Sequence, residues 1–380
     1  MKKIISIVTT LVLFLIGSYF LWASLGRTPP PVNVQLHLDT SYVINADSGK
    51  GNVIGINVYM TPVDYASADH FFSKLDGYLG FCHKKGWLNA KTTVIFPEYI
   101  GSWLVLEGEK NSAYSAPTID RALRGFVLSN FFSYIHAWFM APDEAADKVK
   151  HSVFSTKGQR MANLYQRSFS KLAKKYAVTI IAGSILLPNP EVSQNEIITH
   201  KGSLENITAV FNADGSMQPK LSRKAFPIAD ELPFVRKCPP SELPVYSLPL
   251  GKTSVLICAD SWFPEAYKTI DQEGLALIAV PSYTTIDHSM ATKWAGYSGF
   301  DEPSDVDTTD IGKITLREAW LKYTMPQRIK TTRATYGITV SLRGKLWDLG
   351  TDGELIVYNR GEVFCPAPME GASIVNLWIN

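Results

Sequence analysis

Strand-like and helix-like spacings of apolar residues alternate along the chain from about residue 50 onward. Residues 52–60 and 92–96 form short apolar runs that predict strands. Residues 68–89 and 159–176 carry large apolar side chains at helical spacing, and the second of these leads into a buried-looking strand at 178–183. Such alternation predicts an α/β domain made of packed layers. Further strands are expected at 209–211, 254–258, 276–280, 338–341, 355–358 and 373–377, and a further helix at 316–335.

Two segments interrupt this alternation, at about 103–157 and 283–314, and the second is acidic. The first contains an uncharged, strongly aromatic stretch at 125–140, which is shorter than the about 20 residues that a membrane-spanning helix needs. Polar residues also interrupt its apolar face, so a helix packed over the core is the simpler interpretation. The alternative is an arm that dips into a membrane, because exposed aromatic patches often contact lipid.

The N-terminal segment, 1–28, has the composition of a transmembrane anchor. No charged residue occurs between Lys3 and Arg27, and the run is long enough to cross a bilayer as a helix. A cleaved signal peptide is the alternative, but its apolar region is usually about 7–15 residues long and ends at a small-residue cleavage site. The run here is longer and offers only a poor site at 21–24, which favours an uncleaved anchor.

Charges on either side of this segment predict its orientation. Lys2 and Lys3 precede it, and only Arg27 follows it closely. Under the positive-inside rule, residues 29–380 then form a domain outside the cytoplasm, on the periplasmic or extracellular side. A stiff Thr-Pro-Pro-Pro spacer at 28–31 joins the two parts. The membrane is therefore an expected partner of the single N-terminal helix.

Composition argues against several functional classes. The 380 residues are 46% hydrophobic, which allows a sizeable core, and the formal net charge of +2 gives no reason to expect a nucleic-acid partner. The four cysteines are too scattered for a disulfide framework or a zinc site, and no glycine-rich phosphate loop occurs. No metal or organic cofactor is therefore expected. Outside the cytoplasm, one disulfide could form among Cys82, Cys238 and Cys365.

Three chemically versatile residues lie after apolar strands. Glu98 follows the strand at 92–96, Cys258 ends the strand at 254–258, and Lys224 comes after a strand and a turn. Ligands of α/β proteins bind at the carboxyl ends of such strands. Considered one at a time, a cysteine is more often a small buried apolar residue, and a charged residue is more often solvated in a loop. Only the combination of the three residues favours a functional role over a buried structural cysteine and solvated loop charges.

The segments around these residues resemble the three signature regions of the nitrilase, or carbon–nitrogen hydrolase, superfamily, in the family's order. They are Ile-Phe-Pro-Glu at 95–98, Arg-Lys at 223–224 ahead of Pro227, and Cys-Ala-Asp at 258–260 followed by Phe-Pro-Glu at 263–265. The likeness covers about residues 50–380. It implies a four-layer αββα sandwich over residues 29–380, a fold that usually forms homodimers.

The sequence departs from the family pattern at several points. Glu98 and Lys224 lie further apart than is usual, which the aromatic insertion at about 103–157 explains. Phe226 stands where many relatives have histidine. Lys220 is a second candidate lysine, but its spacing to the following proline fits less well. These departures leave the three residues in place and bear mainly on the substrate.

The resemblance implies a catalytic triad of Glu98, Lys224 and Cys258 that hydrolyses a non-peptide C–N bond of a small-molecule amide. Cys258 is the implied nucleophile, Glu98 the general base and acid, and Lys224 the cation that stabilises the oxyanion. The backbone N–H of Ala259 is expected to assist Lys224. Glu231 is a candidate supporting carboxylate near the nucleophile.

Two other functions remain open. An amine could intercept the same acyl-thioester, which would make the protein an N-acyltransferase for a lipid- or membrane-associated acyl substrate. Bacterial apolipoprotein N-acyltransferases resemble this layout but carry several membrane spans, whereas this chain has one convincing span. The third function is a catalytically inactive binding or scaffold protein that kept the fold.

Overall fold

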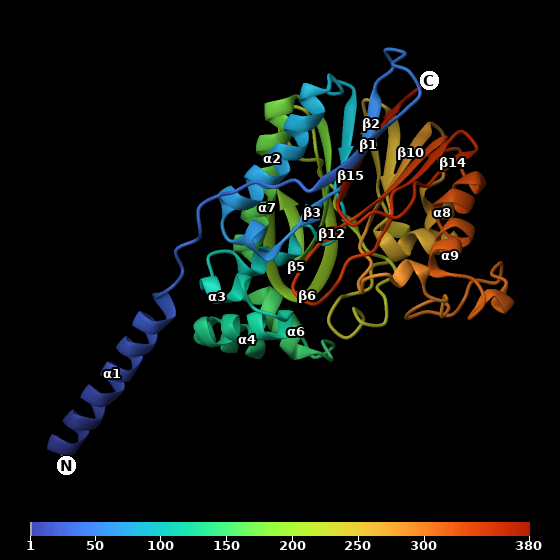
Figure 1. Cartoon of the computed structure of the whole chain (residues 1–380). Helices are drawn as coiled ribbons and strands as arrows, with labels where there is room; N and C mark the ends of the chain where they lie inside the picture. Colours follow the sequence, from blue (N-terminus) through green and yellow to red (C-terminus); the bar gives the residue numbers. More distant parts are fainter. Residues whose placement is uncertain (1) are drawn as a thin grey trace.

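Two β-sheets lie face to face in the computed structural model, which describes residues 2–380 (Figure 1). Helices cover the outer face of each sheet, so the layers follow the order helix, sheet, sheet, helix (Figure 1). The four-layer αββα sandwich that the sequence motifs imply is therefore confirmed.

Within residues 2–380, the first sheet has seven strands and the second has six. The first is ordered β1 (Leu38–Ile44), β15 (Ala372–Trp378), β2 (Asn52–Asn57), β4 (Thr92–Ile95), β5 (Thr179–Ser193), β6 (Glu196–Phe211) and β7 (Ser222–Arg223). The second is ordered β14 (Glu362–Phe364), β13 (Ile356–Asn359), β11 (Tyr336–Ser341), β10 (Leu275–Ser282), β9 (Gly251–Val255) and β8 (Val245–Leu248). Short β3 (Tyr59–Met60) and β12 (Arg343–Gly344) pair with each other. Parallel strands occupy the centre of both sheets.

Branched aliphatic side chains fill the space between the two sheets. Val53, Ile95 and Ile181 of the first sheet share one buried cluster with Val255 and Ile338 of the second. Burial of each such side chain stabilises the fold by about 1.5–3 kcal/mol. Strands that are covered on both faces carry near-continuous apolar runs, which is why the central strands are visible in the sequence.

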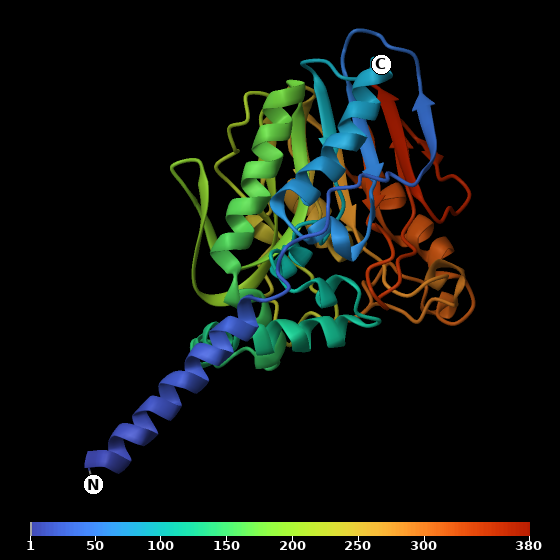
Figure 2. The ribbon, with the colours of Figure 1, turned by 60° about the vertical axis from the view of Figure 1, so that its left-hand side comes forward.

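Helices form the two outer layers (Figures 1 and 2). The first sheet is covered by α2 (Ala68–Lys84) and α7 (Gly158–Tyr176), and the second by α8 (Pro264–Ile270), α9 (Leu316–Tyr323) and α10 (Met325–Arg328). α2 begins where the Ser67 side chain accepts a hydrogen bond from the backbone N–H of His70. α7 ends at Ala177, which adopts the left-handed conformation common at helix ends.

Two elements differ from the sequence expectation. The strands predicted at 178–183 and 209–211 are the two ends of the long β5–β6 hairpin. The helix predicted at 316–335 divides into α9 and α10 at Thr324, which has extended backbone geometry. Pro326 then lies in the first turn of α10, the part of a helix that tolerates proline.

The insertion at about 103–157 folds into short helices at one end of the domain (Figures 1 and 2). These helices are α3 (Asn111–Tyr114), α4 (Ile119–Ser129), α5 (Phe131–Phe139) and α6 (Lys148–Thr156). The aromatic stretch at 125–140 thus belongs to α4 and α5, which meet at Asn130. α1 (Lys2–Ser24) projects from the same end (Figure 1). Its most apolar part has a mean hydropathy of 2.4, which suits a membrane span and is also a feature of signal sequences.

Candidate active site

Glu98, Lys224 and Cys258 line one cavity of about 430 Å³ beside the insertion helices α4 and α6. Each of the three lies shortly after a strand: β4, β7 or β9. The structure therefore brings together the three residues that the sequence motifs single out. Ala259 and Glu231 line the same cavity.

A close approach between two backbone segments positions Glu98. The backbone N–H of Phe96 donates to the Ile181 carbonyl at 3.0 Å, which continues the pairing of β4 with β5. Gly183 follows in β5 with a φ of 67°, and a Cβ atom there would stand 2.1 Å from the Pro97 carbonyl oxygen. Only glycine fits this approach, so the backbone path that leads to Glu98 depends on it.

Lys224 is the centre of a buried ion cluster. Its Nζ donates to Glu98 Oε1 at 2.8 Å and to Glu231 Oε2 at 2.6 Å, and all three side chains are almost completely buried. Burial alone would lower the pKa of Lys224, but the charges of Glu231 and Glu98 raise it well above its ordinary value. Burial raises the pKa of Glu98, against the opposing effect of Lys224. The lysine is therefore a fixed cation at neutral pH, in direct contact with a carboxylate of increased basicity.

Glu231 and Glu98 are held in place by further donors. The Tyr99 hydroxyl donates to Glu231 Oε1, and the backbone N–H of Ile228 donates to Glu231 Oε2 at 2.9 Å. The Asn206 side-chain amide donates to both carboxylates, at 2.9 Å to Glu98 and 3.3 Å to Glu231. These bonds keep two carboxylates on one lysine, although their like charges repel.

Cys258 is the first residue of a short 3-10 helix, Cys258–Trp262, in the loop after β9. Its φ of 49° lies in the left-handed region, where a non-glycine residue stores about 1–3 kcal/mol of strain, and such strain is concentrated at functional sites. The Sγ atom lies 3.8 Å from the Tyr283 carbonyl oxygen. Burial raises the pKa of the thiol and the Glu98 charge raises it further, whereas Lys224 lowers it. The resting side chain is thus a neutral thiol, which needs a base to become a nucleophile.

Asp260 joins the loop of the cysteine to the loop of the lysine. Its Oδ1 accepts from the backbone N–H groups of Ala225 at 2.9 Å and Phe226 at 2.8 Å, and its Oδ2 from that of Ile257 at 3.0 Å. The side chain is fully buried, and burial raises its pKa to about 7, against Lys224 and these N–H groups. The aspartate of the Cys-Ala-Asp segment therefore fixes the spacing of the two loops.

We expect Asp260→Asn to lower the free energy of unfolding by about 1–3 kcal/mol and to reduce turnover. Asparagine accepts through one side-chain oxygen only, so its NH₂ group would face either Ile257 or the N–H groups of Ala225 and Phe226. Denaturant unfolding of the full chain measures the loss. Asp214→Asn, at an exposed turn, is the matched control. Equal effects of the two substitutions would contradict the role of Asp260.

The sequence does not predict Tyr99 or Asn206 as functional, and it gives Asp260 no separate role. A general argument from the sequence pointed to residues of this kind. A charged group that is buried after a strand needs hydrogen-bond donors or counter-charges around it. Lys220, the second candidate lysine, is exposed and does not line the cavity.

Aromatic and aliphatic side chains form most of the remaining cavity wall. The insertion contributes Leu123 of α4 and Phe154 of α6, and the segment after β10 contributes Trp294 and Tyr297. The two segments that interrupt the strand–helix alternation thus contribute to the cavity wall. A largely apolar wall with a few polar groups favours a ligand of the same character.

Comparisons with known proteins agree with this architecture. Residues 150–301 match the family model described as carbon-nitrogen hydrolase. A carbon-nitrogen hydrolase from Helicobacter pylori G27 superposes with a TM-score of 0.51 and 16% identity, over 86% of this chain and 89% of that chain. A cysteine-to-alanine mutant of the Nesterenkonia AN1 amidase, from the nitrilase superfamily, gives a TM-score of 0.50 and 14% identity over 88% and 92%. No curated protein matches the sequence.

The two structural likenesses concern the fold, because the identities are low. The family match concerns the sequence itself and includes Lys224, Glu231 and Cys258. Together these findings show that residues 150–301 match a carbon-nitrogen hydrolase domain and that the two-sheet sandwich has the fold of the two solved proteins.

Proposed function

We propose that the protein hydrolyses the C–N bond of a linear, membrane-associated amide through a thioester on Cys258. The observation that carries this proposal is the convergence of Cys258, Lys224 and Glu98 on one largely apolar cavity. A nucleophile, a buried base and a fixed cation are the groups that acyl transfer through cysteine requires. The carbon–nitrogen hydrolase domain supports the same reaction class.

Glu98 acts first as the general base. It accepts the thiol proton of Cys258 while the sulfur attacks the amide carbonyl carbon, because the raised pKa of the thiol leaves little thiolate beforehand. The carbonyl electron pair moves to oxygen, and Lys224 stabilises the resulting charge together with the backbone N–H of Ala259. The intermediate then expels the amine, which takes the proton from Glu98 and leaves an acyl-thioester.

Water completes the reaction. Glu98 removes a proton from water while the water oxygen adds to the thioester carbonyl. Collapse of this second intermediate expels the Cys258 sulfur, which recovers the proton from Glu98. The net reaction converts amide and water into carboxylic acid and amine. Glu231 transfers no proton in this scheme and instead holds Lys224, to which it lies 2.6 Å away.

Acyl transfer to an amine is the second candidate function. The apolar wall beside the cysteine and the apolar N-terminal helix favour a substrate that resides in a membrane. An amine that reaches the thioester before water does would convert the same intermediate into a new amide.

In this proposal α1 is an uncleaved anchor, and the catalytic domain lies outside the cytoplasm. The Tyr19 hydroxyl donates to the Leu128 carbonyl at 3.2 Å and accepts from the Phe131 backbone N–H at 3.0 Å. A leader that is removed has no need of such contacts, so they favour retention of the helix. Lys2 and Lys3 support the orientation.

A series of primary amides with increasing acyl length tests the substrate class. The full chain in nanodiscs is incubated with acetamide, hexanamide or dodecanamide, and the released ammonia and free acid are measured. Burial of a methylene contributes about 0.8 kcal/mol, so kcat/KM should rise about fourfold per methylene until the apolar wall is covered. A constant or falling kcat/KM along the series would contradict an apolar acyl site.

Adding ethanolamine to the same reactions separates hydrolysis from transfer. Free acid that forms without the added amine supports hydrolysis. An amide product that forms only with ethanolamine, without free acid, supports the acyltransferase instead. Absence of free acid, of an amide product and of an acyl adduct on Cys258 with every amide would indicate the inactive scaffold.

A further inference from the structure

We infer that α1 and the outer side of α4 and α5 form one bilayer-contacting surface, which holds the catalytic cavity at the membrane. The surface on the insertion, called the apolar arm face, consists of Leu128, Phe131, Phe132, Phe139 and Met140, all of which are exposed. The evidence for this surface is the exposure of its side chains and their contacts with α1, which do not depend on the proposed function. Its consequence for substrate entry rests on the proposed function.

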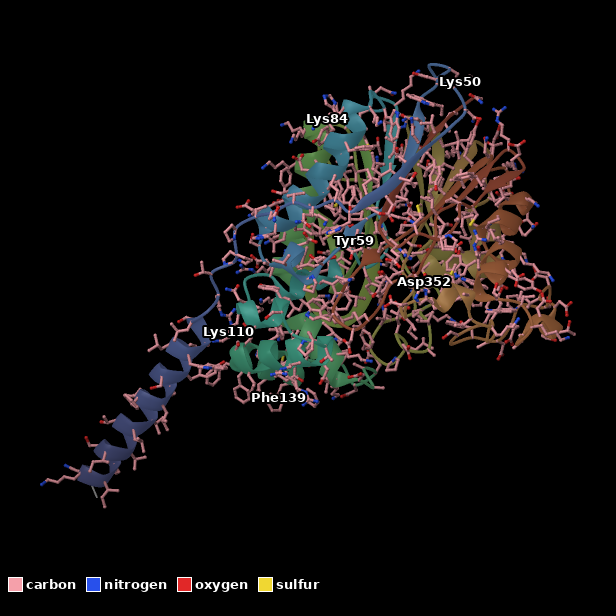
Figure 3. All side chains as sticks on the ribbon, in the orientation of Figure 1. Lys50, Tyr59, Lys84, Lys110, Phe139 and Asp352 are labelled. Carbon is pink, nitrogen blue, oxygen red and sulfur yellow. The ribbon has the colours of Figure 1, made fainter. Side chains whose placement is uncertain are left out.

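The apolar arm face is unusually rich in large exposed side chains. Phe139 is 75% exposed and Phe132 is 53% exposed, and the rings of Phe131 and Phe132 lie 5.6 Å apart. Figure 3 shows Phe139 on the outside of the arm, at the end of the domain from which α1 projects. Soluble monomers rarely expose contiguous apolar patches larger than a few hundred Å², and larger ones mark interaction sites.

Aromatic contacts join this face to the end of α1. The ring of Phe132 lies 5.3 Å from that of Tyr19 and 5.8 Å from that of Phe20. On the adjoining side, the Lys110 Nζ lies 4.3 Å from the centre of the Trp22 ring and donates to the Leu25 carbonyl at 2.9 Å. Figure 3 shows Lys110 where α1 meets the domain. The arm face therefore continues the apolar surface of the helix.

Arg27 fixes the angle between α1 and the arm. Its guanidinium donates to the Gly108 carbonyl at 2.9 Å, to Glu109 Oε1 at 3.1 Å and to the Ser129 carbonyl at 3.2 Å. Glu109 is buried and also forms an ion pair with Lys157. A guanidinium held at several points in this way permits little rotation of the helix relative to α4.

A lipid bilayer is the occupant that fits both parts of the surface. α1 carries no charged residue after Lys3, and from there its side chains are exposed apart from the half-buried Tyr19 and the buried Ala23, so lipid is the environment that satisfies it. A face that packs on the last turns of a spanning helix lies at the level of the membrane interface. Tryptophan and lysine at that level, here Trp22 and Lys110, are typical of the headgroup region.

The same helices separate the bilayer from the catalytic cavity. Leu123 of α4 and Phe154 of α6 belong to the cavity wall, whereas Leu128 of α4 belongs to the apolar arm face. A single layer of short helices thus lies between lipid and Cys258. An amide with a long acyl chain could then reach the cysteine from the bilayer without exposing the chain to water.

Fluorescence quenching tests the depth of the arm face directly. In a background with Cys258→Ala and Cys365→Ser, Phe139→Cys carries an environment-sensitive fluorophore, and the full chain is placed in nanodiscs of equal parts phosphatidylcholine and phosphatidylglycerol. Val43→Cys, an exposed apolar position on β1, is the matched control. We expect the label at residue 139 to shift to the blue and to lose most of its emission to lipids with nitroxide on their tails. The label at residue 43 should respond only to iodide in the buffer.

Two outcomes would overturn the inference. Equal quenching of both labels by iodide would place the arm face in water. Protection of the label at residue 139 from both quenchers would indicate that a second copy of the chain covers it. Met140→Cys repeats the measurement if Phe139→Cys fails to fold, and none of these readouts needs a substrate, so they stand even if the proposed function fails.

The consequence for substrate entry has its own readout. The double substitution Phe131→Ser and Phe139→Ser should lower kcat/KM several-fold for dodecanamide supplied in vesicles, while turnover of acetamide in solution stays unchanged. Equal effects on both amides, or on neither, would contradict delivery from the bilayer.

Discussion

Replacing Lys224 with alanine is expected to lower kcat about 10²–10³-fold and to destabilise the fold by about 3–5 kcal/mol. The loss of turnover follows from the loss of the cation that faces the developing oxyanion. The loss of stability has a different cause. Glu98 and Glu231 are both buried against the lysine, and its removal leaves two like charges without their counter-ion. Steady-state kinetics and denaturant unfolding of the full chain measure the two effects.

The chain offers a matched control for this substitution. Lys220 lies four positions earlier on the same segment and is exposed, so Lys220→Ala should change neither turnover nor stability. Adding Glu231→Gln to Lys224→Ala separates the two effects, because it removes one of the uncompensated charges. The double variant should recover part of the stability and none of the turnover. Recovery of turnover would show that Lys224 acts only through folding.

The pH dependence of the stability difference follows from the shifted pKa of Lys224. Its neighbours raise that pKa above the ordinary 10.5, so the folded state holds the proton more tightly than the unfolded state does. The contribution of Lys224 to the free energy of unfolding is therefore fully present below the pKa that the lysine has in the unfolded chain. This contribution is lost as the pH rises through the higher pKa that Lys224 has in the folded state.

Cys258→Ala should abolish turnover, with a loss of about 10⁴-fold or more, because no other group can form the thioester. Release of ammonia from an amide substrate measures the rate, and peptide mass shows whether an acyl adduct forms. Cys238→Ala is the control, since this thiol is also buried but lies outside the cavity lining. Residual turnover within tenfold of wild type would remove Cys258 from the mechanism.

Alkylation of Cys258 by iodoacetamide should also depend on pH in a particular direction. The thiol has a raised pKa, so the rate without substrate should stay low at neutral pH and keep rising above the ordinary value of 9.0. Lys224→Ala should slow the reaction at any given pH, because the lysine charge lowers the thiol pKa. A plateau below neutral pH would instead reveal a resting thiolate.

The sequence predicts the layered fold and the three motif residues because both depend on local patterns. Central strands buried on two faces appear as apolar runs, and Glu98 and Cys258 directly follow such runs. The edge strand β1 was not predicted, because only part of each face is covered and its residues are mixed in polarity.

Other parts of the site depend on register and are not visible locally. Asn206 reaches Glu98 only because β5 and β6 pair as a long hairpin, which sets residues far apart in the chain side by side. The loop after β7 likewise brings Glu231 back to Lys224. The pairing of Asn206 with Glu98 leaves no recognisable spacing in the sequence, whereas Glu231 was a candidate because it follows Lys224 closely.

The attachment of Arg27 has a practical consequence for releasing the domain from its helix. Glu109 is a buried carboxylate that divides its charge between Arg27 and Lys157. Proteolytic shedding after residue 27 would leave this carboxylate with Lys157 as its cation and would remove the guanidinium that joins Gly108 to Ser129. A cut between α1 and Arg27 would keep these contacts. A water-soluble enzyme for crystallisation or assay should therefore start at or before Arg27. Truncation at the proline segment, residues 28–31, would remove Arg27 and its contacts.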